Sequence, residues 1–574
     1  MSAGLLQRLL VAMSMVRSMR STTPMKSDDL VQHLELRQAV IAAVDDAPVA
    51  EWLCTEMNRR LSPAAAGWHW SSASAEALSG SDEVRPTAAA SVTLATSGDD
   101  EGVPTSCGGL PDAPGSFLLH IDGDSRSAVR VLAADSAGLR AGAARLLREA
   151  HMPAPIGAPA DDGELQAATS VAITVPASLC VRYDASMALW HTRGTMVHPF
   201  RTQPELARYA QDLATFGTNQ LEMVCGETEL SAPSPSQLAS MVAFSDVCQK
   251  HGMNMSLFAA SESSTGNYTA MVDTFRRIPT LASVFMPGGD GGQLVWTAVE
   301  NVTAALRQAH PRAGTWVSAQ MLDGAALQEF WLNVSHAIAA GHLSGGVVYG
   351  PHVRLPLTAF VEKAQGIGAR VRQYPDITHL FGDSFPVPNL HAAWSLTHER
   401  QACCPMPQWA ARIVKLRGNG STPSVGAGAY SEGLGDDLNK VIWSAIAQDP
   451  RLTAVDVTKQ YARYHFGAAT ADVWTEALLS LEQNWLGMPG STNTAIPHSL
   501  ALLRNLTAAS PNTDWRAQMY LKRAYFDAYK LQPKPLVFND DSLPTLVDGI
   551  GNRHWTLCID SDSDRLLTLS GSLT

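Results

Sequence analysis

Eight short apolar runs, each followed by a helical stretch, occupy the middle of this chain. They span residues 181–189, 218–224, 254–260, 282–286, 314–320, 345–350, 369–374 and 425–430. Eight strands that alternate with helices are typical of a closed parallel barrel, whose strands form the inner wall. We therefore predict an α/β fold with a (β/α)8 TIM barrel over residues 179–450.

The residues before the barrel have a different pattern and predict an N-terminal α+β domain over 29–150. We expect its elements to be a helix, three strands and a second helix capped by Asp135, at 30–61, 88–96, 116–121, 128–133 and 136–149. Residues 151–178 are rich in Pro, Gly and Asp and should form a linker.

The residues after the barrel read mainly as helix. Apolar positions recur at helical spacing over 453–486 and 497–529, which predicts a C-terminal helical appendix at 451–531. Residues 532–574 are rich in turn formers and should form an irregular tail.

Composition bounds the kind of partner that the chain can bind. The 574 residues carry a net charge of −12, and 45% of them are hydrophobic. An acidic chain without a basic stripe cannot neutralise phosphates, so we expect no nucleic acid. No apolar run approaches the ~18 residues of a membrane span.

The first 28 residues suggest a targeting segment. They hold four basic residues and no acid before Asp28, which fits a secretory signal, a transit peptide or an unstructured leader. Six of the 15 asparagines begin an N-x-Ser/Thr sequon: Asn254, Asn267, Asn301, Asn333, Asn419 and Asn505. These sequons favour the secretory pathway, with an extracellular or lysosomal destination, over an organellar one.

Cysteine and histidine spacing gives no sign of a metal site. The eight cysteines show no C-x-x-C pattern, and Cys403 and Cys404 are adjacent. Scattered buried thiols are therefore expected in place of a disulfide framework or a zinc site. The histidines are dispersed, and we predict no metal and no cofactor, although histidines from separate strands could still converge.

Three carboxylates stand where barrel strands end, which is where such barrels place their chemistry. Asp290 lies between glycine pairs after the fourth run, Asp376 follows Pro375 after the seventh, and Glu432 follows the eighth. Glycines permit close approach and unusual dihedrals, so Asp290 is well placed as a general acid. A turn aspartate that satisfies its own backbone is the alternative.

Other residues near these strand ends could contact a ligand. His379 could converge with Asp376, and Tyr430 could offer a ring face to a sugar. Asp436 stands at a helix start, where acids usually cap the helix. We expect Lys440 to face solvent or to pair with an acid one turn earlier.

Rival chemistries lack their motifs. The sequence contains no G-x-S-x-G elbow, no P-loop and no H-E-x-x-H. A barrel edge with several carboxylates and aromatic residues has the composition of a glycosidase, which needs two carboxyl groups on either side of a bond.

The same segments resemble known glycosidases. Residues 206–224 are similar to the second barrel strand of the α-glucuronidase and hexosaminidase type, and 116–149 to the small α+β domain before their barrels. Segments 285–292, 374–379 and 430–440 resemble related microbial barrel proteins. The Asp-Glu pair of hexosaminidases is absent, because Gly291 follows Asp290.

The resemblance implies a glycoside hydrolase acting on a carbohydrate substrate. In this interpretation Asp290 is the general acid, and Asp376 and Glu432 are bases or nucleophile. Arg182, at the first barrel strand, and Glu222, at the second, are candidate sugar binders, and a structural ion pair is the alternative for Glu222. A carbohydrate-binding barrel without catalysis is the alternative, and a metal-dependent hydrolase built from the histidines is a third reading.

Overall fold

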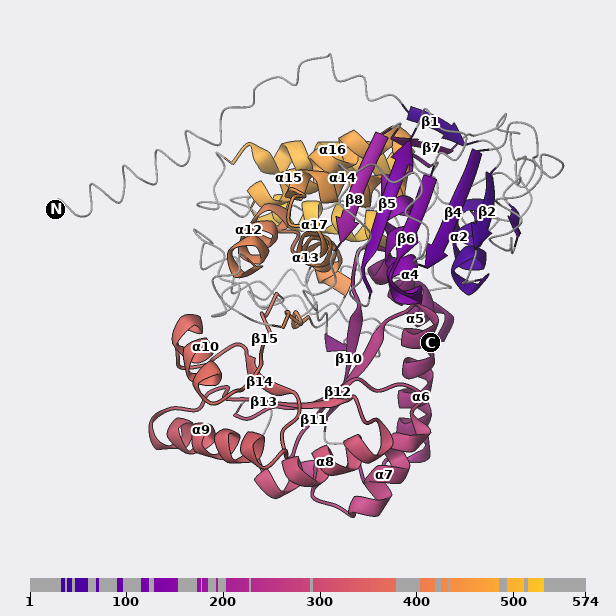
Figure 1. Cartoon of the computed structure of the whole chain (residues 1–574). Coiled ribbons are helices and arrows are strands. Elements are labelled where there is room, and N and C mark those ends of the chain that lie inside the picture. Colours follow the sequence, from indigo (N-terminus) through magenta and orange to yellow (C-terminus); the bar gives the residue numbers. More distant parts are fainter. Residues whose placement is uncertain are drawn as a thin grey trace, which may run out of the picture.

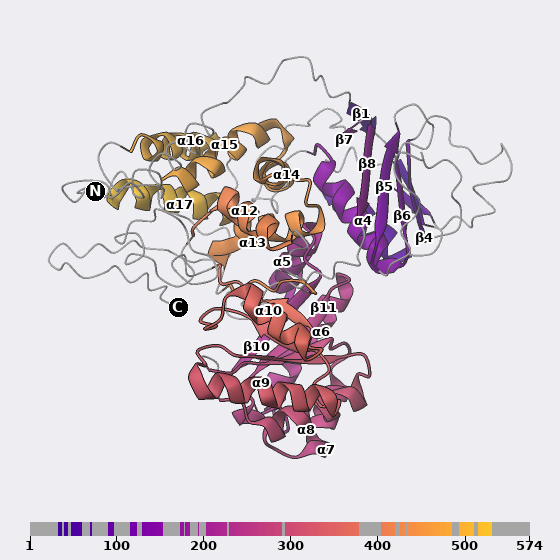
Figure 2. The same ribbon diagram turned by 60° about the vertical axis from the view of Figure 1, so that its left-hand side comes forward.

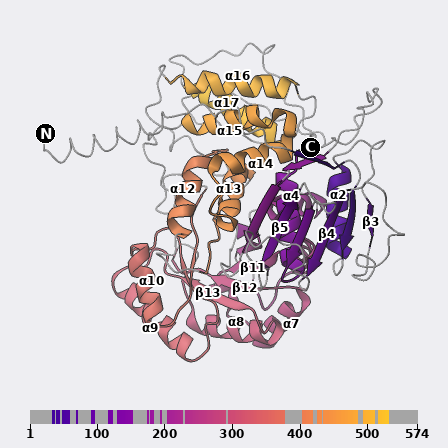
Figure 3. The ribbon, with the colours of Figure 1, turned by 45° about the horizontal axis from the view of Figure 1, so that its top comes forward.

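The computed structural model describes residues 33–36, 39–43, 47–59, 69–71, 90–96, 115–122, 129–152, 173–176, 178–183, 193–194, 203–226, 229–289, 293–377, 403–418, 425–431, 434–484, 493–509 and 515–530. They form a sheet domain, a second sheet surrounded by helices, and a cluster of C-terminal helices (Figure 1). In the tilted view the C-terminal helices lie above the curled sheet, and the N-terminal sheet lies to the right of both (Figure 3).

The N-terminal sheet contains six strands in the order β3-β2-β4-β6-β5-β8. In that order the strands are His69–Ser71, Ala39–Ala43, Ala90–Thr96, Val129–Ala133, Phe117–Asp122 and Ser178–Tyr183. Helix α4 (Ser136–Glu149) packs on this sheet and begins at Asp135, whose side chain accepts from Gly138 N at 2.8 Å. The predicted strands at 88–96, 116–121 and 128–133 and the cap at Asp135 are confirmed.

The helix predicted over 30–61 is wrong in its first half. Residues His33–Leu36 form β1 and Ala39–Ala43 form β2, and only Ala47–Arg59 is helical, as α2. β1 pairs with β7 (Ile173–Pro176), and β2 lies between β3 and β4. Partners far along the chain therefore override the local apolar period, which did not distinguish short strands from a helix.

The first barrel strand was also placed wrongly. Arg182 lies in β8, which pairs antiparallel with β5 in register Leu118↔Arg182, so it belongs to the N-terminal sheet. The strand that precedes the barrel's second run is instead β9 (Arg193–Gly194), which pairs in parallel with β10. Arg182 is thus not at a barrel strand end.

The second sheet has seven parallel strands in sequence order from β9 to β15. After β9 the strands are Gln220–Gly226, Asn254–Ala259, Ser283–Met286, Gly314–Ser318, Gly346–Tyr349 and Val371–Gln373. Helices α5 to α10 alternate with them: Gln203–Thr215, Pro235–Lys250, Tyr268–Arg277, Trp296–Ala309, Gly324–Ala339 and Leu357–Gly366. Each predicted run from the second to the seventh overlaps one of these strands, and β10 extends two residues beyond its run.

This sheet is strongly curled. Five strand spacings separate β10 from β15, about 24 Å if the sheet were flat. Yet Arg372 Nη2 of β15 lies 2.8 Å from Glu222 Oε2 of β10. The eighth segment, residues 425–430, joins β15 through the bridges Gln373↔Ala427 and Asp376↔Tyr430. Among the described residues no ladder joins it to β9, so the closed eight-strand barrel is confirmed only in part.

The two larger hydrophobic cores do not follow the order of the segments in the sequence. The core under the curled sheet gathers residues from β10 to β15 and α5 to α10. The other core joins the N-terminal sheet and α4 to the C-terminal helices α12 to α17. These are Pro407–Gly418, Asp437–Gln448, Ala454–Phe466, Ala471–Gln483, Ala495–Ala509 and Trp515–Lys530. The C-terminal helices therefore lie beside the N-terminal domain, as the rotated view shows (Figure 2).

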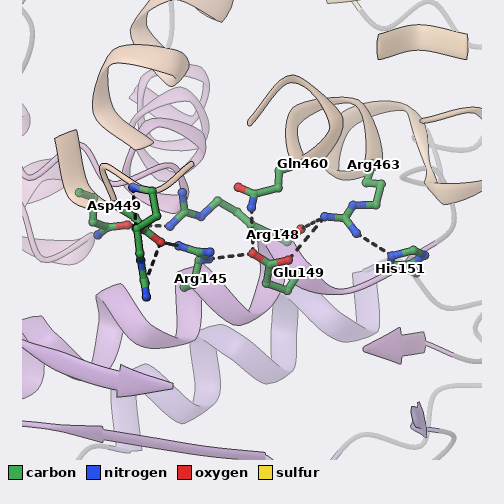
Figure 4. Close-up of polar contacts among 9 residues, drawn as sticks. Arg145, Arg148, Glu149, His151, Asp449, Gln460 and Arg463 are labelled. Atoms are coloured by element: carbon green, nitrogen blue, oxygen red, sulfur yellow. Dashed lines mark hydrogen bonds and ion pairs between the residues drawn. The ribbon is translucent and has the colours of Figure 1, made fainter. Parts of the chain in front are cut away.

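Buried polar contacts reinforce this second core where α4 meets α13 and α14 (Figure 4). Arg145 donates to Glu149 Oε1 at 2.8 Å and to Asp449 Oδ2 at 3.0 Å, and Arg148 donates to Gln448 Oε1 at 2.6 Å. Burial lowers the pKa of Arg148 to about 9. Burying a guanidinium is costly unless its partners stay in place. These contacts therefore hold α4 and α13 in one arrangement.

Candidate functional site

A polar layer lies inside the curled sheet, below its mouth. The Oε2 atom of Glu222 accepts from Arg372 Nη2 at 2.8 Å and from Ser256 Oγ at 3.1 Å. Ser256 and Ser283 share a further hydrogen bond of 2.7 Å, and Gln220 Nε2 donates to Ser283 at 3.3 Å. Glu222 is 4% exposed and forms an internal ion pair with Arg372.

An aromatic layer covers this polar layer. Phe258, Phe285, Trp316 and Tyr374 form one buried cluster, with the Phe285 and Tyr374 rings 5.4 Å apart. The Arg372 guanidinium lies 4.8 Å from the Phe285 ring centroid, a cation–π distance. These rings fill the interior, so the barrel is a packed core at this level and any ligand must bind above it.

Asp376 lies at the mouth, at the carboxyl end of β15. Asp376 is 6% exposed, and its backbone forms a parallel β-bridge with Tyr430 of the eighth segment. The next residue, Ile377, packs into the outer core, whereas Arg372 and Tyr374 line the interior. Side chains alternate along an extended chain, so Asp376 faces the interior side of the mouth.

Tyr430 brings the eighth segment to the same place. Its ring lies 5.9 Å from that of Tyr374 and packs on the aromatic layer while remaining partly exposed. Its backbone is fixed to β15, because Tyr430 N donates to Pro375 O at 2.7 Å and Ile377 N donates to Tyr430 O at 3.0 Å. Tyr430 and Asp376, two predicted site residues, are therefore neighbours.

Asp436 is tied to the eighth segment by a hydrogen bond. It is 2% exposed and accepts from Ser431 Oγ at 2.9 Å, so it ties the end of the eighth segment to the start of α13. The prediction that Lys440 faces solvent is wrong: it is 1% exposed, and its Nζ donates to Tyr209 OH at 3.3 Å. Burial lowers the pKa of Lys440, against the opposing effects of Asp436 and Asp437.

The glycines before Asp290 allow the ends of two neighbouring strands to lie close together. Gly289 has a φ of +77°, and a Cβ there would lie 1.6 Å from the carbonyl oxygen of Gln320. A Cβ on Gly288 would meet Ser318 O at 2.6 Å. Both positions therefore require glycine, and the predicted close approach is confirmed for the neighbouring backbone.

Three predicted site residues, Asp290, His379 and Glu432, lie outside the described residues. Gly289 and Ser431, which precede Asp290 and Glu432 in sequence, both stand at the carboxyl edge of the curled sheet. The catalytic and binding roles assigned to all three therefore stay predictions.

Sequence reasoning missed Arg372 and Arg516 as organising residues. Arg372 stands between Val371 and Gln373 in a strand, and a charged residue on the inner face of a barrel strand needs a buried partner. That signal, together with an acid in another strand, could have suggested the Glu222 pair. Arg516 lies in an amphipathic helix and carried no such signal.

The described residues offer no metal site, since no group of three or more His, Cys, Asp or Glu side chains converges there. The cysteines in the same part of the chain, Cys54, Cys225, Cys248, Cys403 and Cys404, are free thiols. Burial raises the pKa of the Cys225 thiol, which lies at the end of β10, to about 12, so it stays protonated. No helix in the described ranges is long and apolar enough to cross a membrane.

Comparisons with known proteins found similarity in solved structures alone. No family profile matches the sequence. No curated protein matches it either. A GH138 enzyme targeting pectin rhamnogalacturonan II aligns with a TM-score of 0.48 and 11% identity, over 86% of this chain and 69% of that one.

Two structures of a family 89 glycoside hydrolase from Clostridium perfringens align with TM-scores of 0.46. One is in complex with GlcNAc-alpha-1,4-galactose at 9% identity, the other with 2-acetamido-1,2-dideoxynojirmycin at 10% identity. Each alignment covers 73% of this chain and 58% of that chain, so this chain spans less than two thirds of their length.

Proposed function

We propose that this protein is a glycoside hydrolase that cleaves O-glycosidic bonds by acid and base catalysis with paired carboxylates. The observation that carries the proposal is the buried Asp376 at the carboxyl edge of the curled sheet, beside Tyr430. Asp290 and Glu432 directly follow Gly289 and Ser431, which stand at that edge. A set of carboxylates at one barrel edge is what glycoside hydrolysis requires.

The packing below the mouth supports this chemistry. The aromatic layer excludes water from beneath Asp376, and a low-dielectric floor strengthens the electrostatic effect of nearby charges. The guanidinium of Arg372 contacts Glu222 in the polar layer below. In our proposal Asp290 is the general acid, and Asp376 and Glu432 share the role of base or nucleophile.

The other residues take different parts. Tyr430 keeps the role of a sugar-stacking surface, since its ring is partly exposed at the mouth. His379 stays a candidate contact. Arg182 and Glu222 are left out because Arg182 lies in the N-terminal sheet and the Glu222 carboxylate is held by Arg372 and Ser256. Asp436 becomes a structural contact of Ser431.

A carbohydrate-binding barrel without catalysis is the second candidate function. It is favoured by the internal use of two acids near the barrel, Glu222 in an ion pair and Asp436 in a hydrogen bond to Ser431. Such a protein would bind sugars but would leave every glycoside intact.

A screen of aryl glycosides, including glucuronides and N-acetylglucosaminides, tests the proposal. Asp290→Asn and Asp376→Asn should each cut kcat by about 10²-fold or more, because an amide cannot transfer the proton and is nearly isosteric. Asp323→Asn is the matched control, since the side chain of Asp323 is exposed in the segment after β13 and makes no capping hydrogen bond to α9. Full activity in Asp290→Asn would exclude it as the acid, and sugar binding without turnover by the wild type would favour the second candidate.

We further propose that the protein enters the secretory pathway. Asn267 and Asn505 lie in exposed sequons, although Asn267 also caps α7 with its side chain. Expression in a eukaryotic secretory host should add glycans that a peptide N-glycosidase removes with a measurable loss of mass. An unchanged mass after this treatment would count against the proposal.

A further inference from the structure

Arg516, at the start of α17, bridges two buried carboxylates from other helices. Its Nε lies 2.8 Å from Asp437 Oδ2 of α13, and its Nη2 lies 3.0 Å from Asp212 Oδ2 of α5. Arg516 is 4% exposed, and its guanidinium packs 4.3 Å from the Trp515 ring centroid. The rigid fork of a guanidinium can hold two acceptors in fixed directions, which a lysine ammonium cannot do.

The first turn of α13 is fixed from several sides. Asp437, its first residue, is 1% exposed and also accepts from Tyr461 OH of α14 at 2.6 Å. One turn later, the Lys440 Nζ atom lies 5.4 Å from the Tyr209 ring centroid of α5. Three helices, α17, α14 and α5, therefore converge on the point where α13 begins.

A continuous set of contacts leads from this point to the mouth of the curled sheet. Asp436, next to Asp437, accepts from Ser431 Oγ at 2.9 Å. Ser431 follows Tyr430, whose backbone exchanges hydrogen bonds with Pro375 and Ile377 on either side of Asp376. Every link in this path lies in described residues.

We propose that Arg516 is a positioning residue for Asp376, acting through α13 and the eighth segment. Without the Arg516 guanidinium, the carboxylates of Asp437 and Asp212 would be buried near each other with no cation between them. The start of α13 would then shift so that water could reach Asp437. Such a shift pulls on Asp436 and Ser431 and loosens the bridge between Tyr430 and Asp376. The consequence for catalysis rests on the glycosidase function proposed above, whereas the positioning itself does not.

Hydrogen exchange of the full-length protein tests the positioning without a substrate. The reporter amides are those of Tyr430 and Ile377, which make the two hydrogen bonds around Asp376. In Arg516→Met both should exchange at least about tenfold faster, while amides of β11 and β12 keep their wild-type protection. Unchanged exchange at both reporters would overturn the proposal.

Two further variants guard against a general loss of structure. The double variant Arg516→Met/Asp437→Asn removes both charges of one ion pair, so it should fold even where the single variant does not. It still lacks the guanidinium that links α17 to α13. Arg523→Met is the matched control, because Arg523 lies on the same helix, is 4% exposed and pairs with Asp527. It should destabilise the C-terminal helices and leave the reporter amides unchanged; accelerated reporters there would overturn a specific role for Arg516.

Turnover measurements separate this proposal from the proposed function. With an active wild type, Arg516→Met should lower kcat by about tenfold or more with little change in KM, since the ligand-binding surface is kept. If the wild type hydrolyses no glycoside but the exchange pattern holds, the function fails and the positioning stands. If the wild type is active and the variants match it in kcat and exchange, the positioning fails and the function stands.

Discussion

Arg372 and Glu222 form a buried ion pair across the interior of the curled sheet, with Arg372 Nη2 2.8 Å from Glu222 Oε2. Their side chains are 2% and 5% exposed. The two residues come from strands at opposite sides of the sheet, so this contact helps to fix its curvature. The same curvature brings the aromatic rings of Phe258 in β11, Phe285 in β12 and Tyr374, just after β15, together above the pair.

Breaking this pair should destabilise the protein strongly. We expect Glu222→Gln to lower the free energy of unfolding by about 3 to 5 kcal/mol, because it leaves a buried guanidinium without its charged partner. Combining it with Arg372→Met should recover much of that loss, since no buried charge then remains. Urea denaturation of the three proteins measures this, and a loss below about 1 kcal/mol for Glu222→Gln would contradict it.

Gly289 should tolerate no side chain. Gly289→Ala should cost about 3 kcal/mol or more, because the methyl group would overlap the Gln320 carbonyl and φ is positive. Gly324→Ala is the control: its φ is +45° but nothing lies within 4 Å, so only the dihedral cost of about 1 kcal/mol remains. Equal changes in the unfolding midpoint for both variants would show that the close approach is not limiting.

Glu482 should make stability depend on pH. It is 2% exposed, and burial raises its pKa to about 7, although its oxygens accept from the backbone N atoms of Gln408 and Trp409 at the start of α12. The folded state then binds more protons than the unfolded state, so this group's contribution falls as pH rises from about 4.5 through about 7 and levels off by about pH 8.

Glu482→Gln removes this titration. The stability of the variant should therefore fall less than that of the wild type between pH 5 and 7, and the difference between the two proteins should stay nearly constant above about pH 8. Urea midpoints at these pH values provide the measurement. Parallel curves for the two proteins across the whole range would refute the assignment.

If the protein is a glycosidase, it should invert the anomeric centre. Asp290 and Glu432 follow the fourth and eighth barrel runs, which lie opposite each other in an eight-strand barrel. Inverting pairs are about 6.5 to 9.5 Å apart, which leaves room for a water, whereas retaining pairs are about 5 to 5.5 Å apart. Proton NMR of the first product distinguishes them, and a product with the substrate's own configuration would indicate a covalent intermediate.

The chain's local patterns determined most of the curled sheet by themselves. Six of the eight predicted runs overlap parallel strands in the expected order, because buried parallel strands are apolar runs that end at glycine or polar residues. The glycines before Asp290 and the cap at Asp135 could also be predicted from the sequence, since each meets a local backbone requirement. The prediction of carboxylates at strand ends rests on the same order of elements, and of the three only Asp376 lies in the described residues.

Only the tertiary structure decided the pairing of distant segments. β2 and β8 are short apolar runs whose sheet partners lie elsewhere in the chain, so a local period could not place residues 39–43 or Arg182. The contacts of Glu222 with Arg372 and of Asp437 with Arg516 join residues 150 and 79 positions apart. A buried charge is tolerable only beside its partner, and that partner is chosen by how the sheet curls and the helices pack.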